Sequence, residues 1–233
     1  MAPCAARGVM GEGADSWPRP ETEVSLGVFA RAPKAGSTKT RLGAAIGHEA
    51  AAALHRAFIE DTLVHCQTLA PTTLFVTEDH PFFDEVAARA KVAIARQRGD
   101  GLGARMRAAL QDLRQKSAAG VLVGSDAPWW PPRALRDAVA AHLAFGPSHD
   151  GGFYLVSAKG DVDFDGITWS TASTLSQTLA ANAARAPLLL EPWFDVDEID
   201  DLQTLMAFLG AAPADCAIHT RAALALAGLS NGT

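Results

Sequence analysis

The sequence predicts an α/β domain built around a parallel or mostly parallel sheet with helices on both faces. Short apolar runs of strand length alternate with longer segments of helical periodicity from Val24 to about Leu143. Strands that are joined through helices run parallel, and both faces of such a sheet need a helical cover. The chain has 233 residues, of which 48% are apolar and 20% are charged, so it can bury a sizeable core.

The spacing of apolar residues places the individual elements. Strands are expected at residues 26–30, 72–76, 91–95 and 121–123. Helices are expected at residues 49–69, from residue 81, at 102–113 and at 133–143. In the third of these helices, Leu102, Met106, Ala109 and Leu113 recur at the spacing of one helix face. The regular alternation of strands and helices ends after residue 143. Beyond it, strands are expected at 153–156 and 187–190 and helices at 171–184 and 200–209.

Composition and charge exclude several classes of protein. The formal net charge of −6 argues against a general nucleic-acid binder, which needs a basic face. The sequence has no run of about 18 apolar residues that could cross a bilayer, so no membrane partner is expected. Cys4, Cys66 and Cys216 lie far apart, which predicts neither a disulfide framework nor a zinc site. A reducing cytoplasm is the simplest location.

A basic loop follows the first expected strand and is the first candidate site. Lys34, Lys39 and Arg41 carry positive charge, and Gly36 lets the backbone curl closely around a ligand. The residues expected to bind phosphate or nucleotide here are Ala30, Arg31, Pro33, Lys34, Gly36, Lys39 and Arg41. The order of a Walker loop is absent. A solvated basic loop without a ligand is the alternative.

Asp126 follows the most apolar of the expected strands. A carboxylate at the carboxyl end of a buried strand lies where open α/β sheets place ligands. Mg²⁺ is commonly held by one or two carboxylates together with phosphate oxygens, so Asp126 is a candidate metal ligand. The neighbouring Ser125 is a candidate donor to a phosphate or ribose. The alternative is that Asp126 caps the turn or the next helix.

Asp195 and Asp197 follow the last expected strand. Residues two apart in an extended segment point to the same side, so the two carboxylates can share a cation. Clustered carboxylates repel each other unless a cation neutralises them. The alternative is that Asp197 caps the following helix, where Asp200 and Asp201 are expected as helix-start residues.

Two glycine-containing segments are weaker candidates. Asp100, Gly101 and Gly103 precede or open a helix whose N-terminus can face a phosphate, although a simple turn and cap would also explain them. Asp150 lies beside Gly151 and Gly152, which allow close approach of the backbone to a ligand. Asp150 is therefore a candidate for holding or deprotonating an acceptor hydroxyl.

Taken in order, these segments resemble a known family. The motifs are Phe29-Ala-Arg-Ala-Pro-Lys-Ala-Gly with Lys39-Thr-Arg-Leu, Gly99 to Met106, Gly124-Ser-Asp-Ala-Pro, Gly146-Pro-Ser-His-Asp-Gly-Gly-Phe-Tyr, Trp169-Ser-Thr and Asp195-Val-Asp. The chain is similar to bacterial GT-A-type transferases known as radical-SAM/selenodomain-associated transferases, some of which are assigned as arsenosugar-biosynthesis glycosyltransferases. More distantly, it resembles phospholactate and molybdenum-cofactor guanylyltransferases.

The resemblance implies a three-layer α/β/α GT-A fold with a mostly parallel mixed sheet. It also implies Mg²⁺ or Mn²⁺ at Asp126, with Asp195 and Asp197 as further metal carboxylates, and contact of Lys39 and Arg41 with the phosphates. One departure from the family is Trp129, which stands where an acidic residue is usual. Gly151, Gly152 and Trp169 are expected to contact the acceptor, since glycines admit close approach and tryptophan can stack on a sugar or base.

The expected organisation is a loosely ordered leader at residues 1–23 and one transferase domain at residues 24–233. Within the domain, residues 24–143 are expected to bind the nucleotide and residues 144–233 the acceptor. The leading hypothesis is a metal-dependent glycosyltransferase that uses a nucleotide-sugar and a small acceptor, with Asp126, Asp150 and Lys39 as catalytic residues. The alternatives are a nucleotidyltransferase, which joins a nucleoside triphosphate to a phosphorylated metabolite and releases pyrophosphate, and a non-catalytic nucleotide-binding protein.

Overall fold

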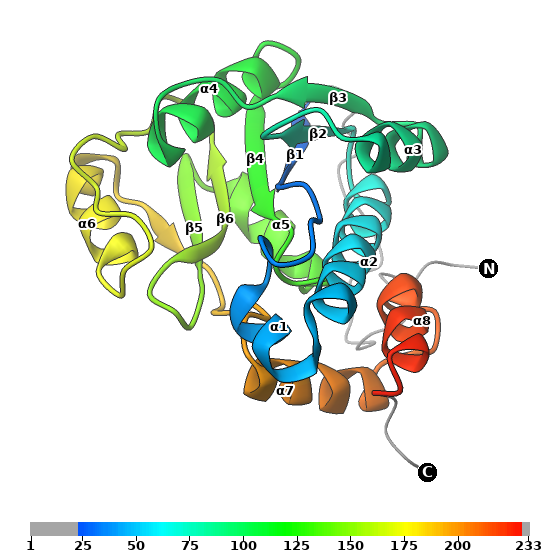
Figure 1. Ribbon diagram of the computed structural model, residues 1–233. Coiled ribbons are helices and arrows are strands. Elements are labelled where there is room, and N and C mark those ends of the chain that lie inside the picture. Colours follow the sequence, from blue (N-terminus) through cyan, green and yellow to red (C-terminus); the bar gives the residue numbers. More distant parts are fainter. Residues whose placement is uncertain (1–22, 230–233) are drawn as a thin grey trace.

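The computed structural model describes residues 23–229, so all but the last residue of the expected leader lies outside the described part. Seven strands form a single sheet (Figure 1). They are β1 (Val24–Ala30), β2 (Thr72–Val76), β3 (Ala93–Arg96), β4 (Ala119–Gly124), β5 (Leu143–Pro147), β6 (Phe153–Ala158) and β7 (Leu188–Leu189). The helices in the described range are α1 (Thr40–Ile46), α2 (His48–Gln67), α3 (Pro81–Ala90), α4 (Leu102–Arg114), α5 (Pro132–Ala140), α6 (Thr174–Ala181), η2 (Ala183–Arg185), α7 (Ile199–Ala211) and α8 (Ile218–Leu226).

The strand order is β3-β2-β1-β4-β6-β5-β7. The pairs β1–β2, β2–β3, β1–β4 and β5–β7 are parallel, whereas β6 runs antiparallel to both β4 and β5. A mostly parallel mixed sheet, as predicted, is therefore confirmed. The carboxyl ends of β1 and β4 and the start of β6 meet at one edge of the sheet, because β6 is the reversed strand.

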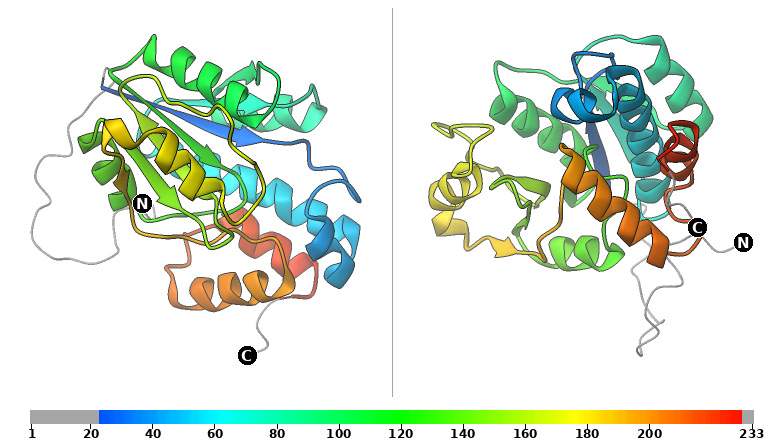
Figure 2. Two further views of the ribbon diagram at one scale, coloured as in Figure 1. Left: turned by 90° about the vertical axis from the view of Figure 1, so that its left-hand side faces the viewer. Right: turned by 60° about the horizontal axis from the view of Figure 1, so that its bottom comes forward.

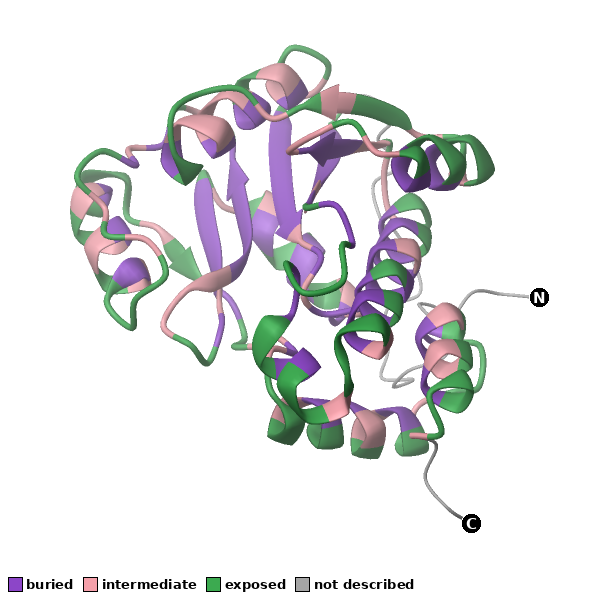
Figure 3. Cartoon of the chain, viewed as in Figure 1, coloured by how far each residue is buried: buried purple, intermediate pink, exposed green. Residues whose placement is uncertain are grey.

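Two apolar layers enclose the sheet and follow the alternation of its strands. Val121 and Val123 of β4 pack into a core shared with α2, α3 and α5, while Leu122 between them packs into a second core with α4. Leu175 and Leu179 of α6 also lie against that second core. Opposite faces of a strand carry alternate residues, so the sheet is the middle layer of an α/β/α sandwich with buried central strands (Figure 3).

A third apolar cluster joins α1, α2, α7 and α8 beside the sheet (Figure 2). It includes Leu42 of α1, Phe58 of α2, Leu205 of α7 and Leu224 of α8. Val196, which precedes α7 in the chain, is fully buried in the same cluster. This packing fixes the segment around Val196 next to the end of β4.

The sequence prediction was wrong at several elements. It omitted α1, β5 and α8, and it extended the helix at 133–143 through Leu143, the first residue of β5. Leu102 was expected on the buried face of α4, but its side chain is 40% exposed, since it is the first residue of the helix. Within residues 23–229, no helix is long and apolar enough to span a membrane.

Candidate functional site

A pocket of about 430 Å³ lies where β1 and β4 end and β6 begins. Phe29, Ala30 and Arg31 bring the end of β1 to it, and Ser125 and Asp126 bring the end of β4. The predicted site residues that line it are Ala30, Arg31, Ser125, Asp126, Asp150, Gly152, Trp169, Asp195 and Asp197. Residues from both halves of the chain therefore share one cavity.

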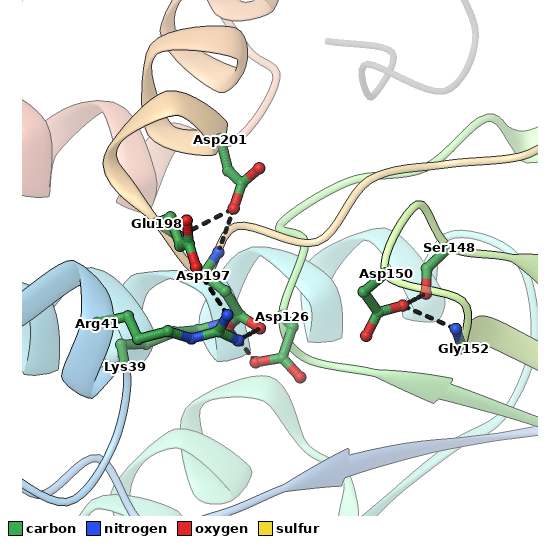
Figure 4. Close-up of polar contacts among 9 residues, drawn as sticks. All are labelled: Lys39, Arg41, Asp126, Ser148, Asp150, Gly152, Asp197, Glu198 and Asp201. Atoms are coloured by element: carbon green, nitrogen blue, oxygen red, sulfur yellow. Dashed lines mark hydrogen bonds and ion pairs between the residues drawn. The ribbon is translucent and has the colours of Figure 1, made fainter. Parts of the chain in front are cut away.

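Lys39 links two of the aspartates at this pocket (Figure 4). Its ammonium group donates to a carboxylate oxygen of Asp126 and, over 2.8 Å, to Asp197. The Lys39 side chain is only 3% exposed. Burial alone would lower the pKa of Lys39, but the charges of Asp126 and Asp197 outweigh it and raise the pKa above its ordinary value. Lys39 is thus a permanently charged, buried cation.

The two pocket carboxylates Asp126 and Asp195 carry opposite pKa shifts. Burial favours the neutral form of Asp126, but the charge of Lys39 and its hydrogen bond prevail and lower the pKa of Asp126 to about 2. Burial, followed by the negative charges of Asp126 and Asp150, raises the pKa of Asp195 to about 7. Asp195 is therefore the carboxylate whose negative charge lacks compensation, which is the situation a bound cation would relieve.

The segment Asp195–Asp197 is held beside Asp126 by its backbone. The amide of Val196 donates to the carbonyl oxygen of Asp126 over 3.0 Å, and the Val196 side chain is buried on the side away from the pocket. Since neighbouring residues of an extended segment point to opposite sides, Asp195 and Asp197 both reach the pocket, as expected from their spacing.

Asp197 does not cap α7. Glu198 is the N-cap, and the Asp201 carboxylate accepts from the amides of Asp197 and Glu198 over 3.0 and 2.9 Å. Asp200 and Asp201 lie in the first turn of α7, which confirms their expected place at the helix start. The Asp197 carboxylate instead binds Lys39 and, over 3.4 Å, Arg41. The alternative reading of Asp126 as a helix cap is also wrong, because Pro131 is the N-cap of α5.

Asp150 lies in the turn between β5 and β6 (Figure 4). Its Oδ1 atom accepts from the hydroxyl of Ser148 and, over 2.8 Å, from the amide of Gly152. The other carboxylate oxygen has no hydrogen-bond partner recorded within the described chain. The turn therefore fixes the orientation of the Asp150 carboxylate and leaves Oδ2 for a ligand.

Trp169 forms an aromatic wall of the pocket together with Phe153. The two rings meet edge to face with their centroids 6.3 Å apart. Trp169 also contacts Phe164, with centroids 5.9 Å apart. A Cβ atom at Gly103 would come within 2.8 Å of Phe164 and 3.0 Å of Trp169, so this glycine lets α4 approach the tryptophan closely.

Other predicted residues do not line the pocket: Pro33, Lys34, Gly36, Lys39, Arg41, Asp100, Gly101, Gly103 and Gly151. Lys34 points to Glu78 at the surface, and Arg41 binds Glu198 over 2.7 Å. Gly151 has a φ of +88°, and its backbone packs so closely on Ala172 that a Cβ would lie 2.4 Å from it. Lys34 and Arg41 therefore form ion pairs in this structure, and Gly151 allows the turn to pack closely on Ala172.

Several residues that line the pocket were not among the predicted site residues: His55, Thr77, Gln97, Arg105, Tyr154 and Thr174. His55 comes from α2, and burial lowers its pKa to about 4, while its Nε2 atom lies 3.2 Å from the carbonyl oxygen of Arg31. Arg105 lies in a segment that the prediction singled out for Asp100, Gly101 and Gly103. Its charge, one helical turn after Gly101, was the available signal.

The carboxylates suit a divalent cation that also binds phosphate. The described residues contain no group of three His, Cys, Asp or Glu side chains arranged to hold a metal ion by themselves. Mg²⁺ usually keeps only one or two carboxylate ligands beside phosphate oxygens. Asp126 and Asp195 meet that description, because both line the pocket and repel each other.

Comparisons with known proteins agree with this fold. A family described as an uncharacterized protein conserved in bacteria (DUF2064) matches residues 61–171. A proposed nucleotide-diphospho-sugar transferase from Desulfovibrio desulfuricans G20 is 28% identical, with a TM-score of 0.77 over 91% of this chain and 100% of that one. The fold is that of the nucleotide-diphospho-sugar transferases. No curated protein sequence matches the chain.

More distant structures share the fold. A cytidylyltransferase from Leptospira borgpetersenii serovar Hardjo-bovis (strain JB197) is 15% identical, with a TM-score of 0.52 over 91% of this chain and 98% of that one. A 4-diphosphocytidyl-2C-methyl-D-erythritol synthase from Anaerococcus prevotii DSM 20548 is 9% identical, with a TM-score of 0.53 over 82% and 99%. The expected GT-A-like fold is confirmed. The 28% identical neighbour supports the predicted transferase class.

Proposed function

We propose that this protein is a metal-dependent glycosyltransferase that moves a sugar from a nucleotide-diphosphate donor to a small acceptor. The observation that carries the proposal is the composition of the pocket, which combines the guanidinium groups of Arg31 and Arg105 with the carboxylates of Asp126 and Asp195. The similarity over the whole length of a proposed nucleotide-diphospho-sugar transferase supports it. We expect the reaction to take place in the cytoplasm, without a nucleic-acid or membrane partner.

The donor would lie against the ends of β1 and β4. Arg31 and Arg105 offer positive charge to the diphosphate, and Ser125 offers a hydroxyl at the same edge. Both arginines lack a carboxylate partner among the described ion pairs, whereas Lys34, Lys39 and Arg41 are already paired. We therefore assign phosphate binding to Arg31 and Arg105 ahead of the basic loop.

Asp126 and Asp195 would hold Mg²⁺ or Mn²⁺ beside the diphosphate. When bound, such a cation neutralises charge that develops on the leaving phosphate. Lys39 contributes by fixing the Asp126 carboxylate and keeping it ionised, as its lowered pKa of about 2 indicates.

Asp150 would serve the acceptor. In the transfer, an acceptor hydroxyl oxygen forms a bond to the anomeric carbon of the donor sugar. The bond between that carbon and the diphosphate oxygen breaks, and its electron pair leaves with the nucleoside diphosphate. The Oδ2 atom of Asp150 is available to take the hydroxyl proton, since Oδ1 is held by Ser148 and Gly152.

Nucleotidyl transfer is the second candidate, and the fold that the chain shares with a cytidylyltransferase favours it. In that reaction a phosphorylated acceptor attacks the α-phosphate of a nucleoside triphosphate and pyrophosphate leaves. Two cations would help such a step. Both carboxylate oxygens of Asp197 are held, Oδ1 by Lys39 and Oδ2 by Arg41, whereas Lys39 binds only Oδ1 of Asp126, so Asp197 is the less suited of the two as a metal ligand.

The test compares the wild type with Asp126→Asn and with Asp79→Asn as a matched control. Asp79 is an exposed carboxylate that pairs with Arg96 outside the pocket. Release of nucleoside diphosphate from a panel of nucleotide sugars, and of pyrophosphate from nucleoside triphosphates with phosphorylated metabolites, is measured with Mg²⁺ or Mn²⁺. We expect nucleoside diphosphate release, a fall of about 100-fold in Asp126→Asn and no change in the control.

Two results would count against this function. Pyrophosphate release without turnover of any nucleotide sugar would replace it with nucleotidyl transfer. Thermal stabilisation by nucleotides without any metal dependence, together with no turnover, would point to a non-catalytic binding protein.

A further inference from the structure

The two walls of the pocket differ in charge. Its positively charged lining residues, Arg31 and Arg105, both come from residues 24–143. The wall from residues 144–233 includes Asp150, Phe153, Trp169, Ser170, Asp195 and Asp197. This wall contains three carboxylates and, among its described residues, no lysine, arginine or histidine.

An acceptor that carries a phosphate or carboxylate would meet the negative charge of Asp150, which forms no ion pair with a described residue, whereas Asp197 is already paired with Lys39 and Arg41. Asp150 is held with its carboxylate in place by Ser148 and Gly152, and Asp195 lies near enough to it for their charges to interact. Lys39 is not available to neutralise a second anion, because its buried ammonium group already binds Asp126 and Asp197. Like charges at close range in a partly buried site repel strongly.

The same wall is suited to a neutral compound with a C–H face. Phe153 and Trp169 offer a rigid aromatic surface, since Trp169 is braced by Phe164 and by the close approach of Gly103. Ser170, next to Trp169, is exposed and has a φ of +59°, an unusual backbone conformation for serine. Ser170 lines the pocket at its exposed rim, next in the chain to Trp169.

We propose that the acceptor is an uncharged hydroxyl compound of the sugar or polyol class, and that phosphorylated and carboxylated acceptors are rejected. The inference rests on the proposed glycosyl transfer, and it specifies which acceptor that reaction uses. The apolar C–H face of the acceptor lies on Trp169 and Phe153, and the reacting hydroxyl faces Oδ2 of Asp150, which receives its proton.

The experiment measures binding directly, so it does not depend on turnover. Saturation-transfer NMR on the full chain compares glucose with glucose 6-phosphate and glycerol with glycerol 3-phosphate, in the presence of a nucleoside diphosphate and Mg²⁺. We expect binding of at least one neutral member and at least tenfold weaker binding of its phosphate. Equal or tighter binding of the phosphates, or no binding of either neutral compound, would overturn the proposal.

Three variants test the aromatic and the electrostatic parts of the proposal separately. Trp169→Ala is expected to weaken binding of the neutral compound about tenfold, while Trp169→Phe keeps an aromatic surface and restores most of it. Ser170→Arg adds a guanidinium group to the wall and is expected to improve binding of the phosphates at least tenfold; no change in Ser170→Arg contradicts the electrostatic basis of the selectivity. Failure of donor turnover with intact selective binding would reject the proposed reaction and leave the acceptor class in place.

Discussion

The ammonium nitrogen of Lys39 lies 2.8 Å from a carboxylate oxygen of Asp197, and the same group hydrogen-bonds to Asp126. One buried cation thus joins the start of α1 to the end of β4 and to the segment before α7. The backbone at Lys39 has a φ of +48°, in the left-handed region that non-glycine residues seldom adopt. The surrounding contacts hold the residue in that conformation.

Replacement of Lys39 by methionine is expected to destabilise the fold and the site together. The variant leaves Asp126 and Asp197 without their shared cation, and both carboxylates are only partly exposed, at 41% and 37%. We expect a loss of about 1–3 kcal/mol in the free energy of unfolding, less than for a fully buried pair because solvent screens the aspartates. Urea denaturation measures it.

The control for this variant is Lys34→Met. Lys34 forms an ion pair with Glu78 in which both side chains are exposed, so its removal should change stability by less than about 1 kcal/mol. Equal losses for the two lysine variants would show that burial of the Lys39 cation is not what stabilises this region.

The positions of Ser125 and Asp126 could be predicted from the sequence, because they depend on local pattern. A short apolar run followed by Gly-Ser-Asp marks a strand end, and parallel strands bring such ends to one edge. The partners of Lys39 could not be predicted in this way. Asp126 and Asp197 are 87 and 158 residues away along the chain. Only tertiary packing places these two carboxylates, rather than a phosphate, next to the ammonium group of Lys39.

The missed elements have physical causes as well. The strand β5 contains a glycine and a proline, which weaken any strand pattern, and it is buried through pairing with β6 and β7. The helix α8 is short and alanine-rich, and its start depends on a distant residue. The carboxylate of Asp61 on α2 accepts from the amides of His219 and Thr220, so the cap of α8 lies outside its own sequence.

Gly151→Ala should disturb the turn that holds Asp150. A side chain at residue 151 would have to adopt a φ of +88° and would meet the backbone of Ala172 at 2.4 Å. The positive φ alone costs about 1–2 kcal/mol, and the clash adds to it, so we expect a loss of about 2–4 kcal/mol. Gly166→Ala is the control, since its φ is +70° but, apart from its chain neighbours, no described residue has an atom within 4 Å of the added Cβ. Equal unfolding midpoints in urea for the two variants would contradict the close packing.

Because of His65, the free energy of unfolding is expected to decrease as the pH is lowered. Burial lowers the pKa of His65 to about 4 from an ordinary 6.5. The unfolded chain therefore takes up a proton that the folded chain resists, so the stability present above pH 6.5 is lost as the pH falls towards 4. At pH 5 this amounts to about 2 kcal/mol. His65→Phe should remove that part of the pH dependence and keep edge-to-face contact with Trp130.

The comparison between variants isolates His65 from groups that titrate in the same range. The lowered pKa of His55 acts in the same direction, while the raised pKa of Asp195, about 7, opposes it. Both groups remain in His65→Phe and in the control His142→Phe, which replaces an exposed histidine. Urea denaturation at pH 5 and pH 7.5 gives the slopes. If the free energy of unfolding of His65→Phe changed between pH 7.5 and pH 5 as much as that of the wild type, the buried imidazole would already accept a proton in the folded state.

Arg105 and Arg107 on α4 provide a matched test of the donor site. Arg105 lines the pocket, where its Nε atom donates to the carbonyl oxygen of Gly99 over 3.3 Å, and it has no carboxylate partner among the described ion pairs. Arg107 binds Asp165 over 2.8 Å and does not line the pocket. Calorimetric titration with nucleoside diphosphates should show about tenfold weaker binding for Arg105→Gln, since a charged hydrogen bond to phosphate is worth about 1.5–3 kcal/mol and solvent reduces that value at an open pocket. Arg107→Gln should bind as the wild type does. Because both variants remove one positive charge from the same helix, a general effect of net charge would weaken them equally, and only direct contact with the donor separates them.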